Sequence, residues 1–291
     1  MKYLLIALTL LLASCHHSTQ RNQENDKPII TVSIEPQKYF AEAIAGDHFK
    51  VVSMVPKGNN PENYDPTPQQ LVDLENSCAY LRIGYIGFEQ SWMERINDNV
   101  GHLPVFNTAK DILFITDSTH HHGNHTHEGG IEPHVWTSTN NALIIARNTY
   151  NAIRTLDKDN EKIYFERYDS LCNVINATDR TIRNVLAQDT TARSFMIYHP
   201  ALSYFARDYQ LTQHAIEDNG KEPSPSHLKH LIDQTRKEKI QVIFVQPEFD
   251  KRNAEVIAQQ TGARIVPINP LNYNWADELI SIAQQLVAKP Q

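Results

Sequence analysis

The feature that most constrains the fold is a long stretch, residues 159–188, that contains neither glycine nor proline. A helix of this length would span roughly 45 Å, at about 1.5 Å per residue, which is enough to run from one globular lobe to another. Two shorter helices with a break near residues 176–178 are the alternative. Apolar residues recur along the stretch with the period of one helical face: Ile163, Tyr164, Tyr168, Leu171, Val174, Ile175, Ile182, Val185 and Leu186.

Short apolar runs alternate with helical segments on both sides of this stretch. Strands are expected at 29–34, 49–55, 79–83, 194–198, 211–216, 240–245 and 264–268, and helices at 36–45, 69–76, 88–96, 141–156, 201–208, 226–238, 251–261 and 275–287. Such alternation predicts βαβ units and a parallel sheet in each half. The predicted fold class is therefore α/β, with two parallel-sheet lobes, 28–157 and 190–291, joined by one long rigid helix at 158–189.

The first residues have the features of a targeting segment. Lys2 precedes an apolar run from Leu4 to Leu12, as in a secretory signal peptide. The run ends in Leu12-Ala13-Ser14-Cys15, which resembles the bacterial lipobox. That resemblance implies a signal peptide at 1–14, lipidation of Cys15 and a lipid-anchored polar tether at 15–27; an ordinary cleaved signal with a chance cysteine is the alternative. The expected location is the bacterial cell envelope, facing the periplasm or the outside of the cytoplasmic membrane.

Charge and hydropathy exclude two classes of protein. The formal net charge of −7 argues against a nucleic-acid-binding surface. No stretch beyond the N-terminal segment reaches the roughly 18 apolar residues of a membrane span. We therefore expect no nucleic-acid partner and no transmembrane body.

A histidine-rich run precedes the segment Glu132-Pro133-His134-Val135-Trp136. Neutral imidazole is the commonest metal ligand in proteins, and a tract this polar cannot form a packed core. The run predicts a solvated loop that attracts metal ions, although a polar insertion without a role is the alternative. His134 could likewise be a structural histidine. The histidines of the run are His120, His121, His122, His125 and His127.

Further candidate donors follow the expected strands in both halves. In open α/β sheets, ligands bind beyond the carboxyl ends of the strands, so the cleft between two lobes is the expected site. Nitrogen and oxygen donors of this kind suit zinc and also manganese. The side chains that could converge there are Glu62, His134, His199, Glu248 and Asn269.

Several segments together give the chain a family resemblance. It is similar to the solute-binding proteins of zinc and manganese ABC importers, in the cluster with a long backbone helix, over nearly all of residues 28–291. Each motif is weak alone, but their order along the chain is specific. They are Gly58–Pro68, Glu132–Trp136, Tyr198–Ala206, Glu222–Ser224 and Gln246–Phe249.

The resemblance implies metal ligands at Glu62, His134 and His199. This chain departs from the family pattern twice, because Glu62 stands where histidine is usual and Asn269 where an acid is common. The fourth ligand could be Glu248, the Asn269 oxygen or a water. Two imidazoles and the histidine-rich run favour Zn²⁺, whereas the Glu62 carboxylate also suits Mn²⁺.

The function that the resemblance implies is capture of a divalent metal outside the cytoplasmic membrane. A monomeric receptor would pass the ion to an ABC importer permease and its ATPase. The histidine-rich run would gather ions near the cleft or sense their abundance. The rival class is a zinc hydrolase, although the chain has no His-Glu-x-x-His motif. A metal-binding adhesin or storage lipoprotein is a third reading.

Overall fold

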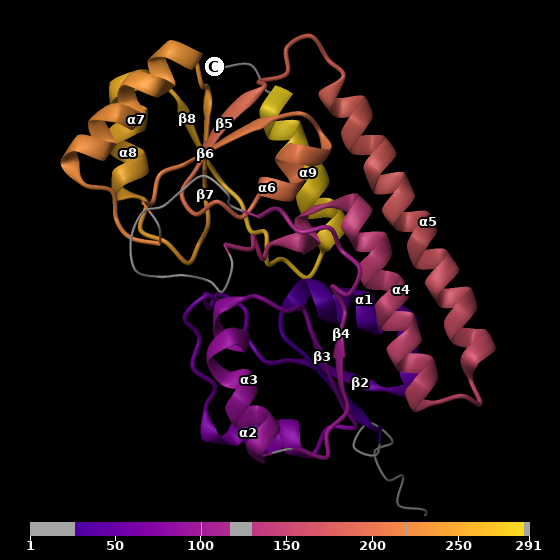
Figure 1. Ribbon diagram of the computed structural model, residues 1–291. Helices are drawn as coiled ribbons and strands as arrows, with labels where there is room; N and C mark the ends of the chain where they lie inside the picture. The colour runs from indigo at the N-terminus through magenta and orange to yellow at the C-terminus, as the bar shows by residue number, and fades with distance from the viewer. Residues whose placement is uncertain (1–26, 100, 117–129, 219, 288–291) are drawn as a thin grey trace, which may run out of the picture.

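Two four-stranded parallel sheets form the two halves of the protein, as the computed structural model shows for residues 27–99, 101–116, 130–218 and 220–287 (Figure 1). The predicted α/β fold class is confirmed. The N-terminal sheet has the order β2-β1-β3-β4, and the C-terminal sheet the order β6-β5-β7-β8. The strands are β1 (Ile29–Val32), β2 (Lys50–Ser53), β3 (Ala79–Arg82), β4 (Val105–Asn107), β5 (Ser194–Ile197), β6 (Thr212–Ala215), β7 (Val242–Val245) and β8 (Arg264–Pro267).

Helices connect the strands of each half and cover both faces of its sheet (Figure 1). Two of them begin with the same chemistry. Thr67 and Ser224 each accept a hydrogen bond from a backbone N–H of the first turn, and a proline follows each of them. The helices are α1 (Glu35–Ala45), α2 (Pro68–Glu75), α3 (Gly87–Asn99), α4 (Thr139–Leu156), α5 (Glu161–Leu186), α6 (Ser203–Asp208), α7 (Pro225–Glu238), α8 (Arg252–Thr261) and α9 (Trp275–Val287), with 3₁₀ turns at Gly46–His48 and Val135–Thr137.

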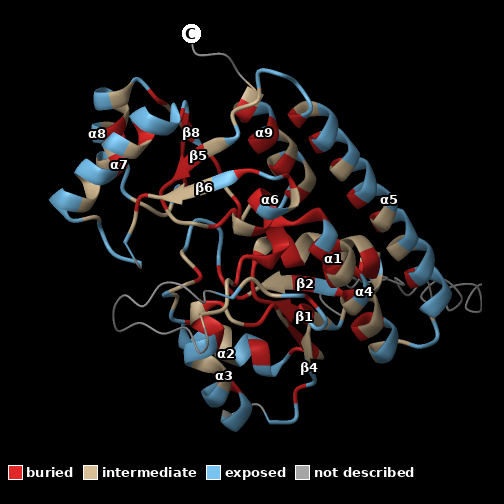
Figure 2. Cartoon of the chain, turned by 45° about the horizontal axis from the view of Figure 1, so that its top comes forward, coloured by how far each residue is buried: buried red, intermediate tan, exposed pale blue. Residues whose placement is uncertain are grey.

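The long helix α5 is continuous over 26 residues, a length of about 39 Å at 1.5 Å per residue. It has no break at 176–178, where the Thr178 hydroxyl donates to the carbonyl of Val174 inside the helix. Its buried side chains form one stripe, and its outer face is exposed (Figure 2). The stripe packs on α1 and α4 from the N-terminal half and on α9 from the C-terminal half, so α5 bridges the two halves.

One apolar cluster extends from the N-terminal sheet to the C-terminal helices. It contains Ile30 of β1, Ile175 of α5 and Ile282 of α9. Because side chains alternate along a strand, Phe195 and Ile197 face this shared cluster. The intervening Met196 belongs to a second cluster beneath α7 and α8.

The two halves also meet at a pair of tryptophans. The Trp136 indole N–H donates to the Pro270 carbonyl at 2.9 Å, and that of Trp275 donates to the Trp136 carbonyl at 2.6 Å. Both rings are buried, and Trp275 packs edge-on against Phe40 of α1. These contacts fix the segment that follows His134 against the C-terminal half.

The expected lipidation site Cys15, most of the expected tether and the histidine-rich run lie outside the described residues. Within the described ranges, no helix combines the length and the apolar character that a membrane crossing requires.

Candidate metal centre

Three of the side chains singled out in the sequence converge between the two halves. Glu62 lies in the loop after β2, His134 precedes a 3₁₀ turn, and His199 follows β5. Each offers one ligand atom, and these atoms all lie within 4.8 Å of one another. His134 Nε2 is 3.1 Å from His199 Nε2 and 3.7 Å from Glu62 Oε1. Both halves of the chain therefore contribute to this cluster.

The cluster lines a small pocket. Its cavity volume is about 20 Å³, which is room for roughly one water-sized particle. Glu248 and Gln246 from the loop after β7 also line it, as does Trp136. A pocket of this size suits a single ion with direct protein ligands rather than an organic molecule.

A carboxylate orients the ring of His134. Glu132 Oε1 accepts hydrogen bonds from both the backbone N–H and the ring Nδ1–H of His134. Burial alone would lower the pKa of His134, but the adjacent Glu132 and, secondarily, Glu62 raise it above its usual value. Burial acts on Glu132 in the opposite sense, and the contact with His134 leaves the pKa of Glu132 lowered. The carboxylates around His134 thus favour a positive charge at its ring.

A second carboxylate orients the ring of His199. Its Nδ1 lies 2.9 Å from Glu217 Oε1. The Gln246 side-chain amide donates to the backbone carbonyl of His199 and accepts from its N–H. The Phe249 ring stacks on the imidazole, with ring centroids 5.1 Å apart and planes at 14°. These contacts hold His199 by its backbone, its ring edge and its ring face.

The two backing carboxylates determine which nitrogens face the pocket as acceptors. An ionised carboxylate only accepts hydrogen bonds, so Nδ1 of both His134 and His199 must carry the proton. In the neutral rings, Nε2 then carries a lone pair. The two Nε2 atoms face each other at 3.1 Å, a distance at which two lone pairs repel unless a proton or a metal ion lies between them. Carboxylate-backed imidazoles of this kind are characteristic of metal sites.

Two buried carboxylate oxygens that lack hydrogen-bond partners in the described part of the chain also favour a cation in the pocket. Glu62 Oε1 and Glu248 Oε1 are buried and have no hydrogen-bond partner among the described residues. The other oxygen of Glu62 accepts from Gly87 N–H, at 3.2 Å, where α3 begins. A side chain at Gly87 would collide with the Glu62 backbone, 1.9 Å from its carbonyl oxygen. Burial raises the pKa of Glu248.

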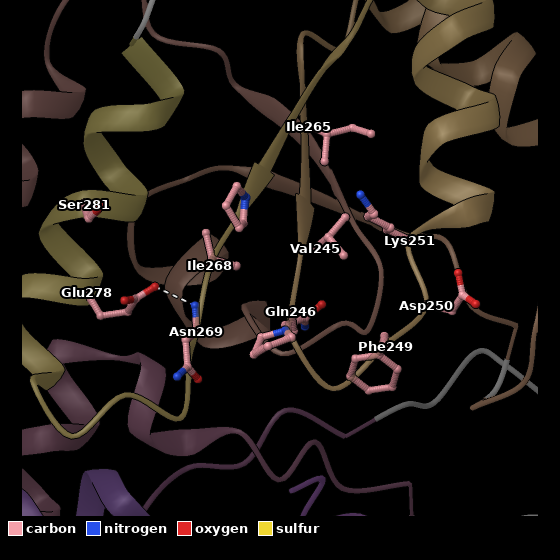
Figure 3. A pocket seen from close by; sticks show the side chains of 12 residues that line it. Val245, Gln246, Phe249, Asp250, Lys251, Ile265, Ile268, Asn269, Glu278 and Ser281 are labelled. Carbon is pink, nitrogen blue, oxygen red and sulfur yellow. Dashed lines mark hydrogen bonds between the residues drawn. The ribbon is translucent and has the colours of Figure 1, made fainter. Parts of the chain in front are cut away.

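Asn269 does not line the pocket of the cluster. Its Oδ1 accepts from Leu271 N–H at 3.0 Å, and its own N–H donates to Glu278 (Figure 3). It lines an adjoining groove of about 770 Å³ beside β8 and α9. Gln246 and Phe249 line both this groove and the small pocket. Of the two side chains considered for a fourth ligand, only Glu248 lines the pocket.

The backing carboxylates were not anticipated from the sequence. Glu132 offers a signal, because it lies two residues before His134 within the quoted motif. Glu217 follows the edge strand β6 and has no recognisable motif. Only the pairing of β5 with β6 brings Glu217 next to His199.

Comparison with known proteins places the chain among metal-uptake proteins. The sequence model of the family "Zinc-uptake complex component A periplasmic" matches residues 30–288. The chain belongs to this family. The high-affinity zinc uptake system protein ZnuA of Bacillus subtilis is 25% identical over 281 residues, covering 92% of this chain and 87% of that protein.

Other proteins that resemble the chain differ in length and in the metal that their names give. The zinc-binding lipoprotein AdcA of Streptococcus pneumoniae is 23% identical over 275 residues, and the chain spans about half (53%) of its length. A crystal structure of ZnuA superposes with a TM-score of 0.83 at 32% identity, covering 91% of this chain and all of that one (100%). A Mn-bound periplasmic metal-binding protein of Candidatus Liberibacter asiaticus shares the fold, with a TM-score of 0.76 at 22% identity over 89% of this chain and 100% of that one.

Proposed function

We propose that this protein captures a divalent transition metal outside the cytoplasmic membrane and delivers it to an ABC importer permease with its ATPase. Family membership and the names of the relatives ZnuA and AdcA support this proposal. Zn²⁺ is the preferred ion. Mn²⁺ is the second candidate, because a structure with the same fold carries it.

The observation that carries the proposal is the pair of imidazole Nε2 atoms that face each other at 3.1 Å. Both rings are held in the orientation that a cation requires, and Glu62 Oε1 lies beside them. We assign His134, His199 and Glu62 as ligands and Glu248 as the fourth. Two nitrogen and two oxygen ligands satisfy the tetrahedral preference of zinc. Two ionised carboxylates would also neutralise the double charge of the ion.

Capture and release of the ion involve no covalent chemistry. A hydrolytic zinc site keeps one position open for water and needs a general base next to it. The pocket of about 20 Å³ leaves no space for a substrate beside the ion. The family is a transport component, and this favours a receptor over a hydrolase, an adhesin or a storage protein.

The remaining parts of the proposal concern location and assembly. AdcA is named a lipoprotein, which supports an anchor on Cys15 in the cell envelope. The proposed receptor acts as a monomer. We assign His120, His121, His122, His125 and His127 the role of gathering ions near the pocket. If deletion of residues 119–128 leaves zinc-limited uptake unchanged, this last role is wrong.

Titration of the metal-free protein with Zn²⁺ and Mn²⁺ tests the assigned site. Because alanine removes a direct ligand, His134→Ala and His199→Ala should each weaken Zn²⁺ binding by more than the roughly 10–100-fold seen for outer-shell changes. The exposed His230 on α7 provides the control, because His230→Ala should leave the affinity unchanged. High-affinity binding that survives both ligand variants would place the site elsewhere.

A further inference from the structure

A chain of hydrogen bonds leads from the C-terminal half to the ring of His134. The Gln213 amide, on β6, donates from Nε2 to Ser203 Oγ at 3.0 Å. Ser203, the first residue of α6, donates to Glu132 Oε2 at 2.9 Å. The other oxygen of Glu132 accepts from His134 Nδ1. Every member of the chain is buried or half-buried.

The direction of each donor in this chain is fixed. The Leu202 backbone N–H donates to Gln213 Oε1 at 2.8 Å, so the amide nitrogen of Gln213 must face Ser203. Ser203 has one proton and can give it to Glu132 or to the carbonyl of Pro200, at 3.1 Å. The charged carboxylate is the stronger acceptor, and Pro200 receives a bond from Gln213 instead, at 3.3 Å.

Tyr204 holds the backbone of the same glutamate. Its hydroxyl donates to the carbonyl of Glu132 at 2.8 Å and accepts from Ile115 N–H at 3.1 Å. The start of α6 therefore contacts Glu132 through both its side chain and its backbone. Since Glu132 comes from the N-terminal half, these are contacts between the halves.

We propose that Ser203 and Gln213 are positioning residues that act across the two halves: they orient Glu132 so that the His134 proton stays on Nδ1 and the Nε2 lone pair faces the ion. This inference rests on the proposed metal-capture function. The C-terminal half would then contribute to the site twice: it supplies His199 as a ligand, and its residues set the tautomer of His134.

The arrangement is asymmetric. His199 is backed by Glu217, a carboxylate of its own half. The carboxylate behind His134 is instead held by hydrogen bonds from the other half. Displacement of α6 relative to the N-terminal half would thus change the hydrogen bonding of Glu132 and the tautomer of His134. The hydrogen bond between Glu217 and His199 would stay intact.

Long-range ¹⁵N–¹H NMR of the metal-free protein tests the proposal, at a pH high enough for His134, whose pKa is raised by the nearby carboxylates, to be neutral. The wild type should show His134 protonated on Nδ1. Ser203→Ala should give a mixture of the two His134 tautomers and about 10-fold weaker Zn²⁺ binding, the lower end of the outer-shell range. Ser203→Thr keeps the hydroxyl and should keep both properties. The His199 tautomer should be the same in all three proteins.

Gln213→Glu provides an independent variant, because its new carboxylate competes with Glu132 for the Ser203 proton. Like Ser203→Ala, it should give a mixture of the two His134 tautomers. Ser170→Ala, which removes an exposed hydroxyl bonded within α5, is the matched control. The proposal is overturned if both Ser203→Ala and Gln213→Glu leave the His134 tautomer at its wild-type state. A wild type that binds no metal would refute the proposed function instead, since the tautomer is measured without metal.

Discussion

The two sheets have the same strand order, but their cores are organised differently. In the N-terminal half, residues from both β1 and the helices around the sheet belong to the one apolar cluster that continues into α5 and α9. In the C-terminal half, only one sheet face belongs to that cluster, and the other face packs in a separate cluster with α7 and α8. Two sheets of the same strand order can therefore pack differently against the rest of the molecule. The α7–α8 layer shares fewer apolar contacts with the other elements than the rest of the C-terminal half does.

The difference between the two clusters can be tested with one truncation in each. Ile282 of α9 lies in the shared cluster and Ile257 of α8 in the separate one, and both are fully buried. Each isoleucine-to-alanine change should cost about 2–5 kcal/mol of unfolding free energy. Ile282→Ala should reduce amide-exchange protection in both halves, and Ile257→Ala chiefly in α7 and α8. Equal loss of protection in the N-terminal half would contradict the distinction.

The two carboxylates of the pocket provide a comparison at the site itself. Glu62, from the N-terminal half, is fixed by Gly87 N–H, whereas the pKa of Glu248, from the C-terminal half, is raised by burial. Because burial works against the charged form of Glu248, its carboxylate should contribute less to binding. Glu62→Gln, which keeps an oxygen donor but removes the charge, should weaken Zn²⁺ binding by at least the roughly 10–100-fold seen for outer-shell changes, and Glu248→Gln by less.

Competition against a chromophoric chelator measures these affinities, with the exposed Glu94→Gln on α3 as control. A larger loss for Glu248→Gln than for Glu62→Gln would reverse the proposed ranking of the two acids.

The smallest expected effect concerns a feature that the halves share. Thr67 and Ser224 cap the equivalent helices α2 and α7 through their hydroxyls. Replacing either with alanine should cost about 1 kcal/mol, as measured by urea unfolding. Thr67 also belongs to a reciprocal capping box with Gln70, so Thr67→Ala should be the more costly. A larger cost at Ser224 would show that the box adds nothing here.

Much of this architecture follows from local sequence signals. The long helix and the alternation of strands and helices were predicted because apolar periodicity and glycine or proline stops act over short distances. Strand β4 was not predicted, since Val105–Asn107 is only three residues long and is exposed or half-buried, so it lacks a marked apolar pattern.

For the candidate site, the sequence predicted the ligands but not the residues that orient them. Glu62, His134 and His199 were selected in advance because each follows a strand or a recognisable motif, and the structure brings them together. The roles of Glu217, Ser203 and Gln213 depend on contacts between segments far apart in sequence or on strand pairing. No local pattern encodes such contacts, so the sequence could not reveal them.

The apolar cluster that continues from β1 to α9 has a consequence for the importer that receives the ion. Swinging the lobes apart would expose this cluster to water, at about 2.5 kcal/mol for every 100 Å² of apolar surface. Exchange of the ion through the loops at the strand ends leaves the cluster intact. The metal-bound and metal-free receptors would then present nearly the same overall shape to the permease. Only the short loops around the pocket would differ between the two forms, so the permease would have to distinguish them by these loops.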